Sequence, residues 1–322
     1  MSKIRFGAVL NYVPELIVKS DWKGLKSIAL ECERLQYDSI WIMDHFTYHG
    51  LPAVLECYTT LSALAEATSK IRIGALVSCN SYRHPPLVAK MIATLDVISN
   101  GRINFGIGAG WKQDEYSMCG YEFPETLTRI EQLRESLLVI REMWANPTAS
   151  FRGKHYHIED MQCGPNCVQK PHPPIWIGGK GKNMLKVVAE LGDYSNIEHS
   201  SLKDYRRRTT ILKEQCKKTG RNYDDITKSI DMEVIIGKSE DEVRRKLRQA
   251  YNNQYFDSAD KWVKKIPIDE YAATRLVGTP DQCASQLKTW LKEDIDYVLV
   301  GWTMNVDDWT LFAEEVIPTV SQ

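Results

Sequence analysis

Asp44 and His45 are the neighbouring residues of this chain best suited to proton chemistry. Histidine changes charge near neutral pH, so its imidazole can pass a proton or stabilise charge that develops on a substrate. An adjacent carboxylate can orient the ring for that work. We therefore predict that His45 is catalytic, against the alternative that it only caps a loop.

A glycine-rich turn offers a second chemistry, the binding of phosphate. It contains Gly178, Gly179, Lys180, Gly181 and Lys182 and precedes a run with helical spacing. Backbone N–H groups and the positive end of a helix attract anions, and glycines let an anion come close. The two lysines add positive charge. A plain turn between a strand and a helix is the alternative.

Two other segments contain reactive or unusual residues without a fixed partner. The glycines within 106–111 are expected to let the backbone come close to a flat bound group. Trp111 is expected either to line a pocket or to belong to the core. No helix is expected directly after them, because the following residues are polar and interrupted by Gly120. Cys79 shares a loop with His84, and we expect it to line a pocket rather than act as a nucleophile.

Cys163 and Cys167 are close in sequence and are flanked by His155, His157 and His172. Structural zinc sites combine two ligand pairs at regular spacing. The second pair is irregular here, so we predict free thiols and no metal.

The composition is that of an ordinary globular protein, with 43% hydrophobic and 26% charged residues. The net charge of −1 gives no indication of a nucleic-acid partner or an anionic membrane. No apolar run approaches the roughly 18–20 residues of a membrane helix. The first strand is expected at Ile4, which leaves no room for a signal peptide, and the cysteines are scattered. We expect a cytoplasmic protein.

The elements that position these residues alternate between strand and helix through nearly the whole chain. Strands are predicted over 4–10, 39–43, 71–77, 103–108, 174–177, 194–197, 230–236 and 297–300. Eight strands, each followed by a helix, predict a single (β/α)8 TIM-barrel domain over 1–322, with insertions at about 145–170 and 238–276. A doubly wound sheet is the competing fold, but its glycine fingerprint should follow the first strand, and the residues after Leu10 lack it.

In such a barrel the carboxyl ends of the strands meet at one rim, where TIM-barrel enzymes have their active sites. The residues that this rule places at the rim are Asn11, 44–46, 76–80, 108–111, 178–182, Asn196, Glu233 and Trp302.

Six segments, together with the glycine turn that ends at Trp111, carry a family resemblance. They are 39–46 (SIWIMDHF), 73–78 (IGALVS), 82–90 (YRHPPLVAK), 93–102 (ATLDVISNGR), 171–179 (PHPPIWIGG) and 278–280 (GTP). As a set they resemble the bacterial luciferase-like monooxygenase superfamily, specifically its coenzyme F420-dependent oxidoreductase branch. The resemblance runs from residue 3 to about residue 302.

The resemblance implies a TIM barrel, a homodimer and a flavin-type cofactor at the carboxyl-terminal mouth. It implies that a non-proline cis peptide between Leu76 and Val77 supports the deazaflavin ring of F420 from behind, and that His45 lies near the carbon that exchanges hydride. The cofactor-binding residues that follow are Asp44, Leu76, Val77, Ser78, Cys79, Ala109 and Gly110, with Gly178, Gly179, Lys180, Gly181 and Lys182 around the phosphate. The pocket for a small organic substrate would contain Asn11, Phe46, Trp111 and Trp302.

One departure from the family bears on the substrate. The sugar-phosphate dehydrogenases of this branch carry a glutamate where this chain has Trp111, so the partner acid is missing here and sugar-phosphate oxidation is disfavoured. The leading hypothesis is hydride transfer between C5 of F420 and a small organic substrate. The alternatives are an FMN-dependent monooxygenase and a non-catalytic F420-binding protein. A hydrolase that uses Asp44, His45 and Glu233 would leave the linked motifs unexplained.

Overall fold

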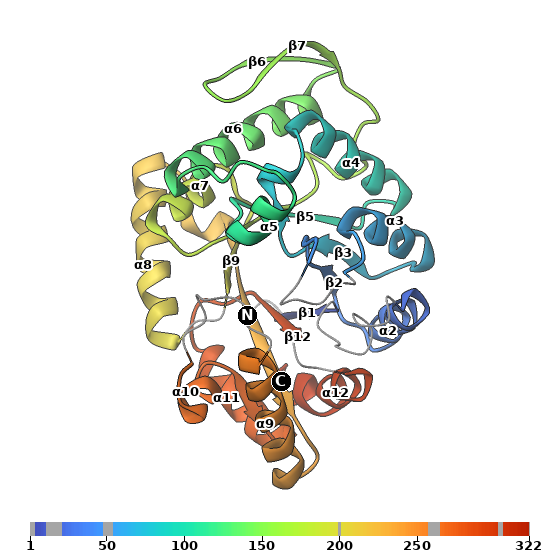
Figure 1. The fold of residues 1–322 in the computed structure, drawn as a ribbon, viewed down its shortest axis with the longest axis vertical. Helices are drawn as coiled ribbons and strands as arrows, with labels where there is room; N and C mark the ends of the chain where they lie inside the picture. The colour runs from blue at the N-terminus through green and yellow to red at the C-terminus, as the bar shows by residue number, and fades with distance from the viewer. Residues whose placement is uncertain are drawn as a thin grey trace.

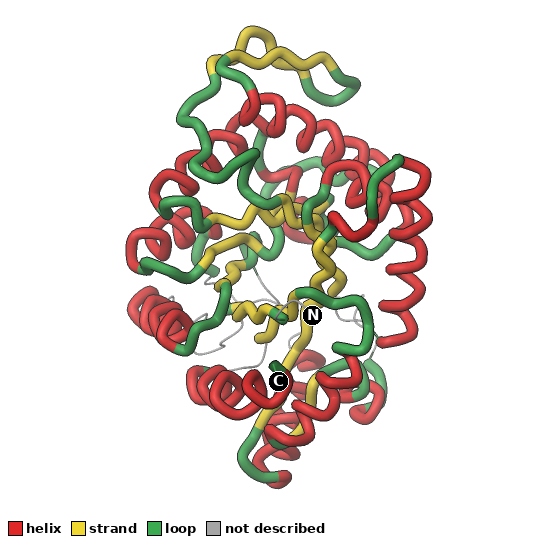
Figure 2. Tube along the Cα trace, turned by 180° about the vertical axis from the view of Figure 1, so that it is seen from behind, coloured by secondary structure: helices red, strands yellow, loops and turns green. Residues whose placement is uncertain are grey.

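Eight parallel strands close into a ring in the computed structural model, which describes residues 4–10, 21–47, 54–198, 201–256, 265–301 and 305–321. Side chains are described in these ranges except at 253–256. The ring runs β1–β2–β3–β5–β8–β9–β10–β12 and returns to β1. Helices surround it in both views (Figures 1 and 2). The predicted (β/α)8 barrel is confirmed.

The strands of the ring follow the predicted ranges to within a few residues. They are β1 (Arg5–Val9), β2 (Ser39–Ile42), β3 (Arg72–Ala75), β5 (Ile103–Gly108), β8 (Ile175–Gly178), β9 (Tyr194–Glu198), β10 (Thr227–Ile236) and β12 (Tyr297–Gly301). Two short strands join the sheet outside this ring, β4 (Ser78–Cys79) beside β5 and β11 (Leu276–Gly278) beside β10.

The helices that cover the ring are mostly those that the apolar spacing predicts. They are α2 (Trp22–Arg34), α3 (Cys57–Ala67), α4 (Pro85–Ile98), α6 (Thr126–Ala145), α7 (Lys182–Leu191), α8 (Leu202–Thr219), α9 (Glu240–Phe256), α10 (Ile268–Ala272), α11 (Pro280–Trp290), α12 (Val306–Leu311) and α13 (Ile317–Val320). Short 3-10 turns occupy Asn80–Tyr82 and Tyr223–Asp225, and a π-helical turn, Phe312–Val316, joins α12 to α13. In the described ranges, none of the helices combines the length and apolarity needed to cross a membrane.

The region directly after the glycines of β5 differs from expectation. A six-residue helix, α5 (Gln113–Met118), begins three residues after Gly110. Its first turn carries Asp114 and Glu115, and negative charge stabilises a helix start. The polar residues that suggested an irregular segment are therefore those that favour this short helix.

Both predicted insertions are present. The first contains an antiparallel hairpin, β6 (Thr148–Arg152) and β7 (His157–Gln162), which lies beyond α6 at the edge of the molecule (Figure 1). The second contains α9, α10 and the unpredicted strand β11. At the start of helix α11, Thr279 and Gln282 form a capping box ahead of Pro280 at the first helical position.

Large aromatic side chains fill the interior of the ring. Trp41 and Trp176 pack edge to face with ring centroids 4.6 Å apart, in a cluster with Val9, Leu76, Tyr297 and Leu299. The neighbouring strands provide room through glycine: a Cβ on Gly74 would lie 2.6 Å from Trp41, and one on Gly7 would lie 2.9 Å from its Nε1. The ring is therefore a packed core with its chemistry at one rim, as in other barrels of this class.

Candidate active site

Consecutive strands of the ring bring together the segments that the sequence singled out. His45 follows β2, Leu76 to Cys79 follow β3, Gly108 to Gly110 follow β5, and the glycine-rich turn follows β8. These four strands are neighbours in the order β2–β3–β5–β8, and the first three are labelled in Figure 1. One half of the rim therefore carries most of the predicted cofactor-binding residues.

His45 has a buried carboxylate partner. Its Nδ1 lies 2.6 Å from Oε2 of Glu115, whose side chain is fully buried, whereas the His45 side chain keeps 14% of its surface exposed. The acid that the sugar-phosphate dehydrogenases carry at the position of Trp111 is missing here, but the imidazole has another acid partner. The acid comes from α5 and not from the position of Trp111, and it contacts Nδ1, the nitrogen turned toward the protein interior.

The Glu115 carboxylate is ionised in this setting. Burial by itself raises the pKa of its carboxyl, but the hydrogen bond and charge of His45 and the N–H group of Thr47 outweigh burial, and the pKa lies below its ordinary value. Its Oε1 accepts the backbone N–H groups of Phe46 and Thr47 at 2.7 and 2.8 Å. The same carboxylate thus anchors the loop that carries His45.

Asp44 is buried and engaged within the protein. Arg83 donates to both of its oxygens, from Nη1 to Oδ2 at 2.7 Å and from Nη2 to Oδ1 at 2.9 Å. The backbone N–H of Cys79 also donates to Oδ2 at 2.9 Å. Asp44 therefore ties the end of β2 to the segment after β3, and its contact with a cofactor stays a prediction.

The predicted cis peptide bond between Leu76 and Val77 is confirmed. Val77 lies beside two glycines of the neighbouring strands, since a Cβ on Gly108 would lie 2.9 Å from its Cγ2 and one on Gly178 would lie 3.0 Å from it. Ser78 is buried and its hydroxyl lies 2.5 Å from that of Tyr58. We call residues 76–79 the shelf, because they form a firmly supported backbone edge at the rim.

Gly110 packs tightly against the end of the shelf. Its φ is +79°, and a Cβ there would lie 2.0 Å from Oη of Tyr116 and 2.8 Å from Sγ of Cys79. That thiol and that hydroxyl are themselves 3.0 Å apart. Burial raises the pKa of the Cys79 thiol to about 11, which keeps it protonated at neutral pH. A protonated thiol is a poor nucleophile, which supports the pocket-lining assignment.

The glycine-rich turn after β8 forms an open start to α7. Gly181 is the N-cap and offers no side-chain hydrogen bond to the first helical N–H groups. A Cβ on Gly181 would meet nothing within 4 Å, and Lys180 and Lys182 are exposed on either side. Uncapped N–H groups, open space and two cations are the features that a bound phosphate needs.

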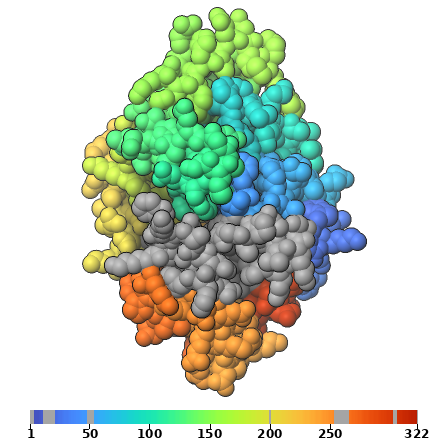
Figure 3. Space-filling model, viewed as in Figure 1, coloured from blue at the N-terminus to red at the C-terminus, as the bar shows by residue number. Residues whose placement is uncertain are grey.

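Aromatic residues surround His45 on the outer side. Trp111 keeps 63% of its surface exposed and meets the imidazole edge to face, with centroids 5.9 Å apart. It is therefore not a core residue. Phe46 packs on Tyr82 at 4.6 Å and stacks on Tyr121 at 6.2 Å. The segment around α5 is exposed on the face of the molecule shown in Figure 3, where it is green. Asn11 and Trp302 lie outside the described residues.

Glu233 belongs to a different network from Asp44 and His45. It forms an ion pair with Arg275 and accepts a hydrogen bond of 2.9 Å from Tyr271. Its strand, β10, is not a neighbour of β2 in the ring. The structure therefore does not bring together the three residues that a hydrolase would need.

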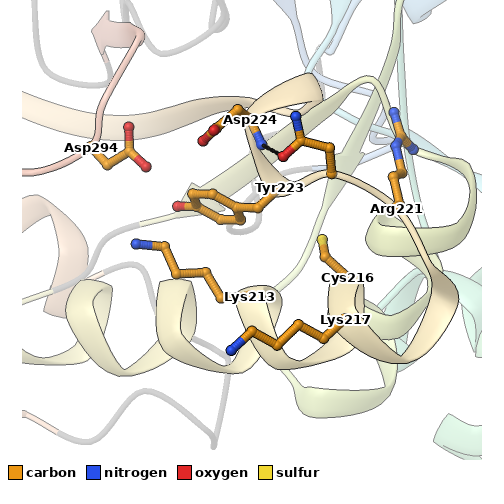
Figure 4. Close-up of a pocket in the computed structure, with 8 residues that line it drawn as sticks. Lys213, Cys216, Lys217, Arg221, Tyr223, Asp224 and Asp294 are labelled. Atoms are coloured by element: carbon orange, nitrogen blue, oxygen red, sulfur yellow. Dashed lines mark hydrogen bonds between the residues drawn. The ribbon is translucent and has the colours of Figure 1, made fainter.

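Two other features lie away from this rim. Cys163 and Cys167 are free thiols, and Sγ of Cys163 donates to the Met161 carbonyl. Among the described residues, no group of three or more His, Cys, Asp or Glu side chains is placed to hold a metal ion. A hollow of about 400 Å³ lies near the amino ends of β10 and β12, at the opposite end of the barrel (Figure 4). It is lined by Lys213, Cys216, Lys217, Arg221, Asn222, Tyr223, Asp224 and Asp294.

Comparison with known proteins agrees with this architecture. The model of the luciferase-like monooxygenase family matches residues 4–295. The chain belongs to this family. The enzyme named F420-dependent glucose-6-phosphate dehydrogenase from Amycolatopsis mediterranei (strain U-32) is 24% identical over 316 residues, 92% of this chain and 94% of that enzyme.

Relatives with other cofactor requirements are equally similar. The FMNH(2)-dependent dimethylsulfone monooxygenase of Pseudomonas putida is 24% identical over 318 residues, 92% of this chain and 87% of that enzyme. Among solved structures, an F420-dependent secondary alcohol dehydrogenase in complex with an F420–acetone adduct superposes with a TM-score of 0.84 at 19% identity and covers 99% of both chains. At this identity the superposition establishes the fold.

Glu115 is the functional candidate that sequence reasoning missed. It lies 70 positions from His45, and its neighbours are polar, which is typical of a solvated turn. One signal was available: Glu115 falls in the loop region after β5, which the barrel rule places at the same rim as His45.

Proposed function

We propose that this chain is an oxidoreductase that binds coenzyme F420 and transfers hydride between C5 of the deazaflavin and a small organic substrate. The observation that carries the proposal is the arrangement on four consecutive strands. The shelf, the segment 108–110, which we call the glycine wall, and an uncapped helix start lie on one half of the rim, with His45 at its end.

The residues present fit a flat ring with a phosphate tail. The backbone of Leu76 to Cys79 would support one face of the ring, and Ala109 and Gly110 would border it. The open turn at Gly179 to Lys182 would receive the phosphate, because its N–H groups lack a side-chain cap. When bound, F420 supplies a carbon that accepts or donates hydride, and the protein contributes binding, orientation and proton transfer.

We assign the transfer of the accompanying proton to His45. When an alcohol carbon gives up hydride, its hydroxyl must lose a proton, and the reverse reaction must return that proton. Because Nδ1 faces Glu115, this exchange uses Nε2 on the opposite side of the ring. The neighbouring Trp111 offers an exposed aromatic surface, so we propose that the substrate has an apolar part that packs on it.

FMN-dependent oxygenation is the second candidate, because FMNH(2)-dependent relatives reach the same identity as the F420-dependent ones. A protein that binds F420 without catalysis is the third. We further propose a homodimer, on the family resemblance, and a cytoplasmic location, on the scattered cysteines. Leu87, Val97 and Ile98 of α4 expose apolar surface that such a contact could cover.

Fluorescence titration distinguishes the cofactor hypotheses. Purified protein should quench F420 fluorescence with micromolar or tighter affinity and should not bind FMN. Tight FMN binding without any F420 response would overturn the proposal. His45→Ala should abolish turnover in a panel of alcohols and aldehydes while F420 affinity is retained; F420 binding without turnover in the unmodified chain would favour the non-catalytic hypothesis.

A further inference from the structure

The carboxylate of Glu115 accepts four hydrogen bonds, two on each oxygen. Oε1 accepts from the backbone N–H groups of Phe46 and Thr47, and Oε2 accepts from the Tyr82 hydroxyl at 3.0 Å and faces Nδ1 of His45 at 2.6 Å. An ionised carboxylate has no proton to give. Nδ1 must therefore carry a proton and donate it to Oε2.

We propose that Glu115 is a positioning residue that holds His45 in the tautomer with its proton on Nδ1, so that Nε2 presents the lone pair that takes the substrate proton. A hydrogen bond to one ring nitrogen fixes the role of the other in this way. The catalytic part of the inference rests on the proposed function, whereas the tautomer itself does not.

The geometry specifies a carboxylate and not merely a polar side chain. Glutamine at position 115 would keep the shape but would have a single carbonyl oxygen. The two fixed N–H groups of Phe46 and Thr47 require that oxygen, because an NH₂ group turned toward them would face two donors. The glutamine NH₂ would then face His45, and Nδ1 would have to accept. Glu115→Gln is therefore expected to move the imidazole proton from Nδ1 to Nε2.

The other charged and titratable groups around the pair are engaged in contacts of their own. Asp44 is neutralised by Arg83 on the side of β2, and Tyr82 donates its hydroxyl proton to Glu115 from the segment before α4. Tyr116 of α5 pairs with the Cys79 thiol. Glu115 assigns the proton on Nδ1 through its own hydrogen bond to that nitrogen.

The tautomer can be measured without any substrate. In ¹⁵N-labelled protein at alkaline pH, long-range ¹H–¹⁵N spectra distinguish a protonated Nδ1 from a protonated Nε2, and the His45 signals are those lost in His45→Asn. The wild-type chain should show the proton on Nδ1, and Glu115→Gln should show it on Nε2. Tyr82→Phe is the matched control, because it removes a donor from the same oxygen but keeps the carboxylate, and its tautomer should match the wild type. A wild-type proton on Nε2, or an unchanged tautomer in a folded Glu115→Gln, would overturn the proposal.

Kinetics test the catalytic part separately. In the oxidation direction, Glu115→Gln should lower kcat by about 100-fold, within the range that proton transfer contributes to catalysis, with KM and F420 affinity within about threefold of wild type. Equal kcat values would overturn the positioning role even with the tautomer confirmed. If His45→Asn leaves turnover unchanged, the proposed function of His45 fails, while the tautomer result stands independently. The wild-type spectrum keeps the proposal testable even if Glu115→Gln does not fold.

Discussion

Gly110→Ala perturbs the contact between the glycine wall and the shelf with a single methyl group. Gly110 has a φ of +79°, and its added Cβ would lie 2.0 Å from Oη of Tyr116 and 2.8 Å from Sγ of Cys79. Both neighbours belong to a packed and hydrogen-bonded pair, since Tyr116 is fully buried and the two polar atoms are 3.0 Å apart. The methyl group can fit only if this pair separates.

The expected cost has two parts. A left-handed backbone costs a residue with a Cβ roughly 1–2 kcal/mol. Overpacking a well-filled site costs roughly 1–3 kcal/mol more. Gly110→Ala should therefore lower the free energy of unfolding by about 2–5 kcal/mol, and it should weaken F420 binding because Gly110 is predicted to border the ring.

Gly120→Ala is a matched control for the steric part. Gly120 has a φ of +72°, but a Cβ there would meet nothing within 4 Å. It should cost only about 1–2 kcal/mol, the backbone part alone. The assay is urea unfolding followed by tryptophan fluorescence, and the double variant Gly110→Ala/Tyr116→Phe should recover part of the loss because it removes the atom at 2.0 Å. Equal losses in the two single variants would refute the packing argument.

Three further predictions follow from other contacts. Gly181→Asp should raise Tm slightly, because an aspartate N-cap is better than glycine by roughly a few tenths of a kcal/mol. It should weaken F420 binding at least about tenfold by placing a negative charge where the phosphate is predicted; Gly181→Ala should show neither effect, and unchanged F420 affinity in the aspartate variant would contradict the phosphate site. Asp44→Ala should cost about 3 kcal/mol in urea unfolding, since it leaves Arg83, whose side chain is only 10% exposed, without its bidentate partner. Glu56→Gln, which loses a half-exposed contact to the same arginine, should cost about 0.5 kcal/mol; similar losses would argue against Asp44 as the main partner. The folded-state pKa of Glu115 lies below its ordinary value of 4.5, so the stability that this carboxylate gives the fold is complete above that pH and is lost as the pH falls through the lower folded value. The Tm of the wild type should therefore fall faster than that of Glu115→Gln between pH 5 and pH 3. Parallel curves would contradict an ionised Glu115.

The sequence predicts the ring of this protein well because its strands and helices bury regular apolar faces. The strand Ile103–Gly108 has the bounds that its pattern indicates, and the glycine turns are found where strands end. The elements that the pattern misses are short or lie outside the ring. The strand Leu276–Gly278 has three residues beside β10, and α5 has six, too few for a periodic pattern.

In the candidate site too, local features could be predicted from the sequence, whereas contacts between distant residues could not. Residues fixed by local backbone geometry, such as the cis bond at Leu76–Val77, could be predicted once the family resemblance was recognised. Pairings between distant side chains could not, since Glu115 reaches His45 and Arg83 reaches Asp44 only because β2, β3 and β5 are adjacent in space. The lack of an acid at position 111 therefore did not indicate whether another residue, Glu115, contacts Nδ1 of the imidazole.

The most direct test of the central claim is a crystal structure of this chain with coenzyme F420 bound. The account predicts that the deazaflavin ring rests on residues 76–79 with its C5 on the side of His45, and that its phosphate contacts the first N–H groups of α7 at Gly181 and Lys182. A ring bound elsewhere in the barrel, or a phosphate held away from α7, would contradict the account.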